Sequence, residues 1–218
     1  MPIVPVDAFA EIAREVAAAA KERGFRRKAL VFRKGFEEIV GTFSVDRSKW
    51  NRADEIAFRF SIDAAHVSLH EIYSWEAFRE KDCRPGYGVA TQTIRRDSYC
   101  RGADFPWRLD RDTNFEALRT DVRAALETDV FPRIEAMSSN EGLCEALWEL
   151  YEQRKGAVYL SQCICLICLL HELGQGERLD RIMRATLARL SDPKTQSHLA
   201  SFVAKMARVG IDAEEYRS

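Results

Sequence analysis

Residues 24–63 read GFRRKALVFRKGFEEIVGTFSVDRSKWNRADEIAFRFSID, and they decide the fold because the apolar periodicity changes within them. Before this stretch, apolar residues recur every three or four positions from Phe9 to Ala20, which is the period of an amphipathic helix. Inside it, apolar and polar residues alternate, as they do in strands with one buried and one solvated face. We predict three strands here, over residues 29–33, 37–46 and 56–63.

The helix before this stretch carries its own start and stop signals. Asp7 can cap its N-terminus, and Lys21 and Arg23 in its last turn suit the negative end of the helix dipole. Gly24 suits the left-handed residue that ends many helices, with Phe25 as the apolar residue that follows. We therefore expect the helix to end at Gly24 and to cover the apolar face of the sheet.

Further elements follow downstream. A Pro85-Gly86 turn introduces a predicted fourth strand over residues 87–95. The segment Thr113-Asn114-Phe115-Glu116 is a capping box that starts a long helix, which Pro132 should kink or end. Beyond residue 138 the chain has helical periodicity, with a last helix that begins at Asp192-Pro193 and ends near Gly210.

The predicted fold is therefore α+β. An antiparallel meander of about four strands is packed by the N-terminal helix and a long helix, and an all-α helical-hairpin tail follows. We expect an α+β domain over residues 1–138 and a C-terminal helical module over residues 139–218 that packs on it.

Composition and charge narrow the class of protein. The 218 residues have a formal net charge of -1 at pH 7, which argues against a dedicated nucleic-acid coat but permits a local basic patch. No basic segment followed by an apolar one opens the chain, so no signal peptide is predicted. The most apolar run, residues 159–170, is shorter than the ~20 residues that span a bilayer. We expect a cytoplasmic protein without membrane contact and with reduced cysteines.

Several short motifs occur in a recognisable order. They are Gly24-Phe25-Arg26-Arg27-Lys28 at a helix end, Phe32-Arg33, Asp46-Arg47-Ser48-Lys49-Trp50, the strand through Ile56, Phe58 and Phe60, Ile94-Arg95-Arg96, Trp107, and the helix from Phe115 to Ile134. Over roughly residues 7–138 this pattern resembles the bacterial family numbered 4304 among the domains of unknown function. The resemblance implies an α+β domain with no established activity, and it carries over no catalytic residues.

Two groups of residues resemble metal ligands on paper. Cys163, Cys165, Cys168 and His171 all lie in one apolar segment that is predicted to be helical. Zinc ligands normally come in pairs from separate turns, and one helix cannot surround a tetrahedral ion. We therefore interpret these cysteines as buried thiols.

The second group is a histidine pair. His66 and His70 are four residues apart, so they would share one face of a helix. A zincin motif also needs a glutamate directly after the first histidine, where Val67 stands, and no third ligand is evident. The alternative is a solvated or capping pair. Since nucleophile elbows and phosphate-binding glycine motifs are also missing, we predict no metal, no cofactor and no catalytic residue, and we lean away from an enzyme.

A third group combines basic and aromatic residues in loops at strand ends. The predicted binding residues are Arg47, Lys49, Trp50, Arg95, Arg96 and Trp107. The ends of alternate strands in a meander can gather on one rim, and arginine and tryptophan are favoured at binding hot spots and at stacked or phosphate-bearing ligands. The alternative is that the charges are solvated and that Trp50 or Trp107 fills the core.

Two functions from different classes follow from these patterns. The preferred one is a non-catalytic protein-binding module of the bacterial cytosol, such as an immunity protein or an accessory factor of a toxin or defence system, with an unknown protein partner. The alternative is a nucleic-acid-binding or phosphate-ligand-binding factor, or an enzyme, that uses the rim of arginine and tryptophan. Nucleic acid is the less favoured partner.

Overall fold

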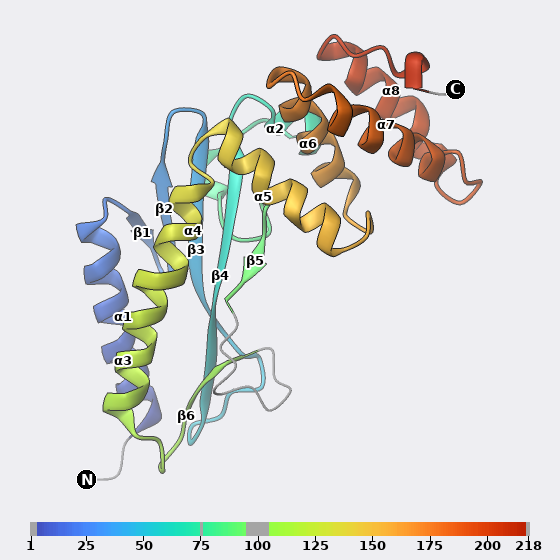
Figure 1. The fold of residues 1–218 in the computed structure, drawn as a ribbon. Helices are drawn as coiled ribbons and strands as arrows, with labels where there is room; N and C mark the ends of the chain where they lie inside the picture. Colours follow the sequence, from blue (N-terminus) through green and yellow to red (C-terminus); the bar gives the residue numbers. More distant parts are fainter. Residues whose placement is uncertain (1–3, 75, 95–104, 217–218) are drawn as a thin grey trace. The chain divides into compact units, whose positions relative to one another are not determined.

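A computed structural model describes residues 4–74, 76–94 and 105–216 of the chain (Figure 1). Contacts divide the chain into two units. The first unit contains residues 1–65 and 80–138, and the second contains residues 66–79 and 139–218. The second unit thus takes a short segment from within the region that precedes residue 138.

The first unit is built on a sheet of six strands within the described residues. The strands are β1 (Arg26–Lys28), β2 (Val31–Gly35), β3 (Ile39–Arg47), β4 (Ile56–His66), β5 (Gln92–Thr93) and β6 (Trp107–Leu109). The first five follow one another in chain order across the sheet, and β6 pairs with β4 beside β5. The β1–β2, β2–β3, β4–β5 and β4–β6 pairs are antiparallel. The predicted α+β class is confirmed.

Helices α1 (Pro5–Glu22) and α3 (Phe115–Ala125) lie side by side against this sheet (Figure 1). Between helices and sheet lies an aromatic core centred on Phe43. Four other rings surround it with centroid separations of 4.4–6.2 Å, namely those of Phe25, Phe32, Phe60 and Phe131. Alternation along β2, β3 and β4 is what brings these rings to one face.

The end of α1 is as predicted, but its start is not. Gly24 has a φ of 82°, and its N–H donates to the Lys21 carbonyl at 3.0 Å. The Phe25 N–H donates to the Ala20 carbonyl at 2.9 Å, which completes a Schellman motif. The helix begins at Pro5, two residues before the predicted cap at Asp7, because proline fits a first turn whose N–H groups lack helical partners.

The long helix differs from prediction at two points. Its cap is Asn114 rather than Thr113, since the Asn114 side chain accepts from the Ala117 N–H at 3.1 Å. Pro132, which was expected to kink or end the helix, does not end the helical run. The chain widens into a π-helical turn, η2 (Leu126–Val130), and continues as α4 (Phe131–Ala136). The wider turn accommodates the missing proline N–H.

Two strand predictions need correction. Of the predicted strand over residues 87–95, the described residues form a strand only at Gln92–Thr93. The polar face of β4 was expected to be solvated, but Ser61 and Asp63 on that face are buried. Asp63 is buried because the chain after the Pro85-Gly86 turn folds around its carboxylate, which accepts from the N–H groups of that segment. The Ser61 hydroxyl donates instead to Asp46 Oδ2 of β3.

The second unit is helical. It consists of α2 (His70–Ser74), α5 (Asn140–Gln153), α6 (Leu160–Glu172), α7 (Gly176–Leu190) and α8 (Leu199–Arg208), with single 3-10 turns at Gln196–His198 and Ala213–Tyr216. Helix α6 is the centre and contacts α2, α5, α7 and α8. Every residue from Gln162 to Leu170 is buried. The last helix begins at Leu199 rather than at residue 192, because Asp192 and the residues after it form a hydrogen-bonded turn.

Candidate functional site

The loop between β3 and β4 is held in place by its own hydrogen bonds. The Asn51 side chain accepts from the Ala57 N–H at 2.8 Å and donates to the Ala57 carbonyl at 3.1 Å, so it imitates a paired strand. The Ser48 N–H donates to the same carbonyl at 2.9 Å, and Arg52 and Glu55 exchange both of their main-chain hydrogen bonds. These local hydrogen bonds hold the tip of the loop in place, and Arg108 of β6 adds an ion pair to Glu55 at its base.

Trp50 projects from this tip with 77% of its surface exposed. Tryptophan is usually well buried, so such exposure of a large ring is informative. The Lys49 Nζ lies 5.0 Å from the centroid of the indole, within the range of a cation–π contact. One face of the ring therefore carries a positive charge, while the remaining surface is open to solvent.

A groove of about 780 Å³ lies beside the tip. Three arginines line it, Arg47, Arg52 and Arg59, together with the carboxylate of Asp46. The Arg59 Nε is 3.7 Å from Asp46 Oδ2, so one cation is partly neutralised. The groove keeps an excess of positive charge, and anionic groups are favoured there.

Two of these arginines rest on aromatic rings. The Arg47 guanidinium lies 5.6 Å from the Phe9 centroid, and that of Arg59 lies 4.8 Å from the Phe105 centroid. A guanidinium that stacks on a ring keeps its N–H groups directed sideways, where they can form paired hydrogen bonds to a carboxylate or phosphate. We call residues Arg47, Lys49, Trp50, Arg52 and Arg59 the Arg/Trp end.

Of the remaining predicted binding residues, Trp107 does not lie at this surface. Trp107 is fully buried, where its Nε1–H donates to Asp121 Oδ2 at 2.7 Å and its ring stacks on Phe58 at 5.7 Å. It joins β6 to α3 and therefore follows the core-filling alternative. Arg95 and Arg96 lie outside the described residues.

Asp63 forms a second polar site, inside the first unit. Its side chain is 1% exposed, and its two carboxylate oxygens accept five hydrogen bonds of 2.8–2.9 Å. The donors are the N–H groups of Ala64, Gly86, Gly88 and Ala90 and the hydroxyl of Thr91. Burial raises the pKa of the carboxyl to about 6, although hydrogen bonds from Thr91 and the main chain act in the opposite direction.

Gly88 shows how closely the loop is wrapped around this carboxylate. A Cβ at Gly88 would lie 2.0 Å from the Ala64 carbonyl oxygen and 2.8 Å from Asp63 Oδ1. Gly86 has a φ of 95°, which completes the predicted Pro85-Gly86 turn. The glycines thus cradle a carboxylate of the chain itself, and Asp63 is a structural residue with no oxygen left for a ligand.

The two histidines do not share a helix face. His66 ends β4, where its Nδ1 accepts from the Leu69 N–H at 3.2 Å and its Nε2 lies 3.0 Å from Asn140 Oδ1. His70 begins α2, with Nδ1 3.0 Å from the Glu76 carbonyl oxygen. Both side chains are buried, so of the solvated or capping pair considered above the solvated form is wrong, whereas His66 accepts a main-chain N–H just before α2 as a capping side chain does. Each ring instead joins segments of the second unit.

The cysteines of α6 lie inside the second unit. Cys163, Cys165 and Cys168 are buried and have free thiols, as predicted, whereas His171 is exposed. Burial raises the pKa of Cys168 to about 12, so the neutral thiol is the stable form at neutral pH. Within the described parts of the chain, no three His, Cys, Asp or Glu side chains are placed to hold a metal ion.

Sequence reasoning missed Arg59 and Asp63. Both occupy the polar positions of the alternating strand β4, which were assigned to solvent. The sequence did contain a signal for Asp63. The later segment Pro85-Gly86-Tyr87-Gly88 has main-chain N–H groups that need an acceptor if they are buried. Among the described helices, none is long and apolar enough to cross a bilayer.

Comparison with known proteins identifies the family of the chain. Neither the curated proteins nor the solved structures included a match to the chain. The family model described as Domain of unknown function (DUF4304) matches residues 16–136, which is more than half of the chain. This range includes the tip of the β3–β4 loop and the Asp63 site. The chain therefore belongs to the DUF4304 family.

Proposed function

We propose that this chain is a protein-binding module and that the Arg/Trp end is its contact surface. The observation that carries the proposal is the 77% exposure of Trp50 on a loop fixed by its own hydrogen bonds. Tryptophan and arginine dominate binding energy at protein interfaces. A tip that is already ordered loses little conformational entropy when it binds, which favours affinity.

The charges of this surface indicate the chemistry of the partner. Arg47, Arg52 and Arg59 line the groove, and Lys49 stands on the indole of Trp50. We expect a partner that inserts carboxylates into the groove and presents an apolar contact to the ring. Guanidinium groups form paired hydrogen bonds with carboxylates, which gives both affinity and orientation.

The test compares two exposed aromatic residues. Trp50→Ala removes the ring of the Arg/Trp end, and Tyr159→Ala removes a ring that is 72% exposed in the second unit. In affinity purification from the native host, we expect the specific partner to fall at least tenfold with Trp50→Ala and to be retained with Tyr159→Ala. A partner that both variants and the wild type capture equally would contradict the proposal.

A second candidate is a phosphate-bearing ligand, such as single-stranded nucleic acid. It is favoured by one observation, which is that three guanidinium groups line a groove beside the loop that carries the exposed indole of Trp50. Binding of a fluorescent oligonucleotide should then weaken steeply with salt, and Arg47→Gln and Lys49→Gln should reduce the salt slope. Anisotropy that is indifferent to salt and to both changes would exclude this candidate.

We further propose that the partner is a toxin or a component of a defence system, with this chain as its immunity protein or accessory factor in the bacterial cytoplasm. The small α+β region, its helical tail and the lack of recognisable catalytic motifs support this assignment. A toxin gene beside the gene for this chain would strengthen it. A neighbourhood made up only of metabolic enzymes would count against it.

A further inference from the structure

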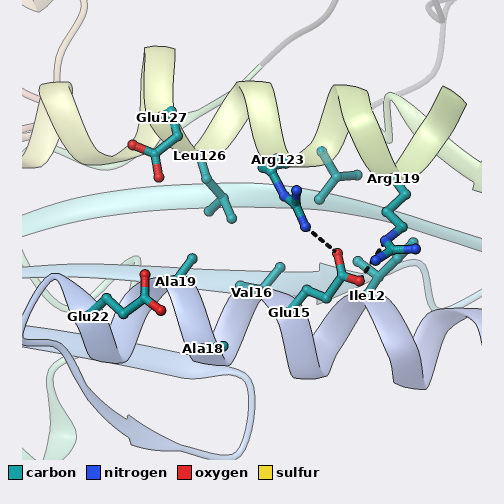
Figure 2. A pocket seen from close by; sticks show the side chains of 11 residues that line it. Ile12, Glu15, Val16, Ala18, Ala19, Glu22, Arg119, Arg123, Leu126 and Glu127 are labelled. Carbon is teal, nitrogen blue, oxygen red and sulfur yellow. Dashed lines mark hydrogen bonds and ion pairs between the residues drawn. The ribbon is translucent and has the colours of Figure 1, made fainter. Parts of the chain in front are cut away.

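A second surface of the first unit has the features of a binding groove. It lies between α1 and α3 and encloses about 270 Å³ (Figure 2). Ile12 and Val16 of α1, together with Val122 and Leu126 of the facing helical run, form an apolar floor. Glutamates and arginines stand along both edges (Figure 2).

The hollow exists because α1 presents alanines where larger side chains would fill the space. Ala18 and Ala19 both line it, and they belong to the run Ala17–Ala20. Contacts between helices are normally packed as densely as a protein core. A volume near 270 Å³ is below the range of most small-molecule sites but is large enough for one leucine or aromatic side chain.

The rim has more acid than base. Arg119 contacts Glu15 at 2.5 Å and also approaches Glu11 and Glu116, and Arg123 lies 3.5 Å from Glu15. At the other end, Arg23 pairs with Glu127 at 2.5 Å and with Glu135 at 3.6 Å. All three guanidinium groups of this network therefore already have carboxylate partners.

Glu22 is a further carboxylate at the groove, and it differs from the glutamates above in its ion pairing. It lines the groove and is exposed, and no described cation forms an ion pair with its carboxylate. Figure 2 shows it at the end of the groove that also holds Glu127, away from Arg119. Among the side chains that line the groove, the carboxylates are Glu15, Glu22 and Glu127, and the guanidinium groups are Arg119 and Arg123. The groove therefore has an excess of negative charge, and an incoming cation is favoured beside Glu22.

We propose that the groove between α1 and α3 binds a partner protein through a segment in which one large apolar side chain is flanked by lysine or arginine. The apolar side chain enters the hollow beside Ala19, and a flanking cation pairs with Glu22. This surface is separate from the Arg/Trp end in both residues and sign of charge. The inference therefore stands whether or not the Arg/Trp end binds a protein.

Three labelled peptides test the chemistry of the occupant. The parent is acetyl-KAAKWKAAK-amide, the second has alanine in place of its tryptophan, and the third has glutamate in place of every lysine. In fluorescence anisotropy at low salt, we expect the full-length protein to bind the parent at least tenfold more tightly than either of the others. Equal binding of the parent and the peptide without tryptophan would overturn the proposal, since the hollow would then contribute nothing.

Variants of the protein test the place of binding. Ala19→Leu fills the hollow and should weaken the parent peptide at least tenfold, whereas Ala10→Leu makes the same change at an exposed position of α1 outside the groove and should have no effect. Glu22→Gln should weaken binding about threefold or more and flatten its salt dependence. If a circular-dichroism melt shows that Ala19→Leu is unfolded, the Glu22→Gln variant becomes the test. Peptide binding and salt dependence that are the same in Glu22→Gln as in the wild type would then overturn the proposal.

The Arg/Trp end provides the last control, because Trp50 beside Lys49 has the chemistry expected of the occupant. Trp50→Ala should leave peptide binding unchanged, and a loss would show that the peptide binds elsewhere. Sedimentation velocity should show no concentration-dependent association. If the protein does self-associate and both Trp50→Ala and Ala19→Leu abolish this, the groove binds Trp50 of a second copy of the chain. That result would overturn the proposal of a separate partner protein.

Discussion

Asp63 and Trp50 lie in two regions of the first unit that differ in what their side chains contact. Asp63 is bound by the chain itself, whereas Trp50 is exposed to solvent. The Asp63 carboxylate is buried, and four of the five hydrogen bonds that it accepts come from one loop of the same chain, residues 86–91. Trp50 and the cations beside it are held at the surface by a loop that needs none of their side chains for its own hydrogen bonds. The contrast separates a group that builds the fold from groups that remain available to a partner.

The largest expected effect is at Asp63. Asp63→Ala would leave the N–H groups of Gly86, Gly88 and Ala90 without their acceptor, and buried donors without partners cost roughly 1–3 kcal/mol each. We expect the free energy of unfolding to fall by roughly 3–5 kcal/mol in urea denaturation. A loss below about 1 kcal/mol would mean that the loop finds other acceptors and that Asp63 does not build the fold.

The pH dependence of stability should carry the next effect. Burial raises the pKa of Asp63 to about 6 in the folded chain, from the value of 3.8 that an aspartate has in water. At Asp63 the folded state therefore binds more protons than the unfolded state between these values. The contribution of this residue to the free energy of unfolding is largest below about pH 4 and falls by roughly 2–3 kcal/mol as the pH rises through 6.

Two measurements separate the contribution of Asp63 to the pH dependence of stability from that of other titrating groups. A ¹³C titration of the Asp63 carboxyl carbon gives its pKa directly, and the pH slope of wild-type stability can be compared with that of Asp63→Asn, which cannot titrate. A carboxyl pKa below 3.8 would show that the five hydrogen bonds outweigh burial, and stability would then rise with pH instead.

Gly88 tests how closely the loop must approach β4. A Cβ added there meets the Ala64 carbonyl oxygen at 2.0 Å, so the main chain has to move. We expect Gly88→Ala to lower the free energy of unfolding by roughly 1–3 kcal/mol. Gly35→Ala is the matched control because no atom lies within 4 Å of its added Cβ, and it should cost less than half as much. Similar losses for both variants would argue against a closely wrapped loop.

Trp50 should show the smallest effect on stability. Because the ring is largely in solvent, Trp50→Ala should change the free energy of unfolding by less than about 0.5 kcal/mol. A melt and a urea titration suffice to measure this. A loss of 2 kcal/mol or more would place Trp50 with Asp63 among the residues that build the fold, and the Arg/Trp end would lose its main support as a binding surface.

The sequence carried local signals that were sufficient for much of the fold. The helix stop at Gly24 and the strand through Ile56, Phe58, Phe60 and Ile62 follow from short-range features, and both are confirmed, although burial alternates along this strand only as far as Phe60. What failed depended on long-range packing. Asp63 has the pattern of a solvated position, and only the return of residues 83–91 across β4 buries it.

As with the fold, the part of the candidate site that depends on neighbours in sequence could be predicted, and the part that depends on long-range packing could not. Arg47, Lys49 and Trp50 are neighbours in sequence, so their clustering needed no knowledge of the fold. Trp107 could not be placed, because a tryptophan beside a turn suits a surface or a core equally well until Asp121 of α3 is found opposite its Nε1. The division of the chain at residue 138 stays a prediction.

The short segment of residues 66–79 limits how the chain can be cut. The family match ends at residue 136, yet α2 of this segment packs on α6, and the buried Lys205 Nζ donates to the Ile72 carbonyl. A shortened chain that stops after the family match would keep His66, Ile72 and Tyr73 but lose the helices that bury them. Such a fragment would expose apolar surface and tend to aggregate, so binding studies on the family region require the helices that follow it.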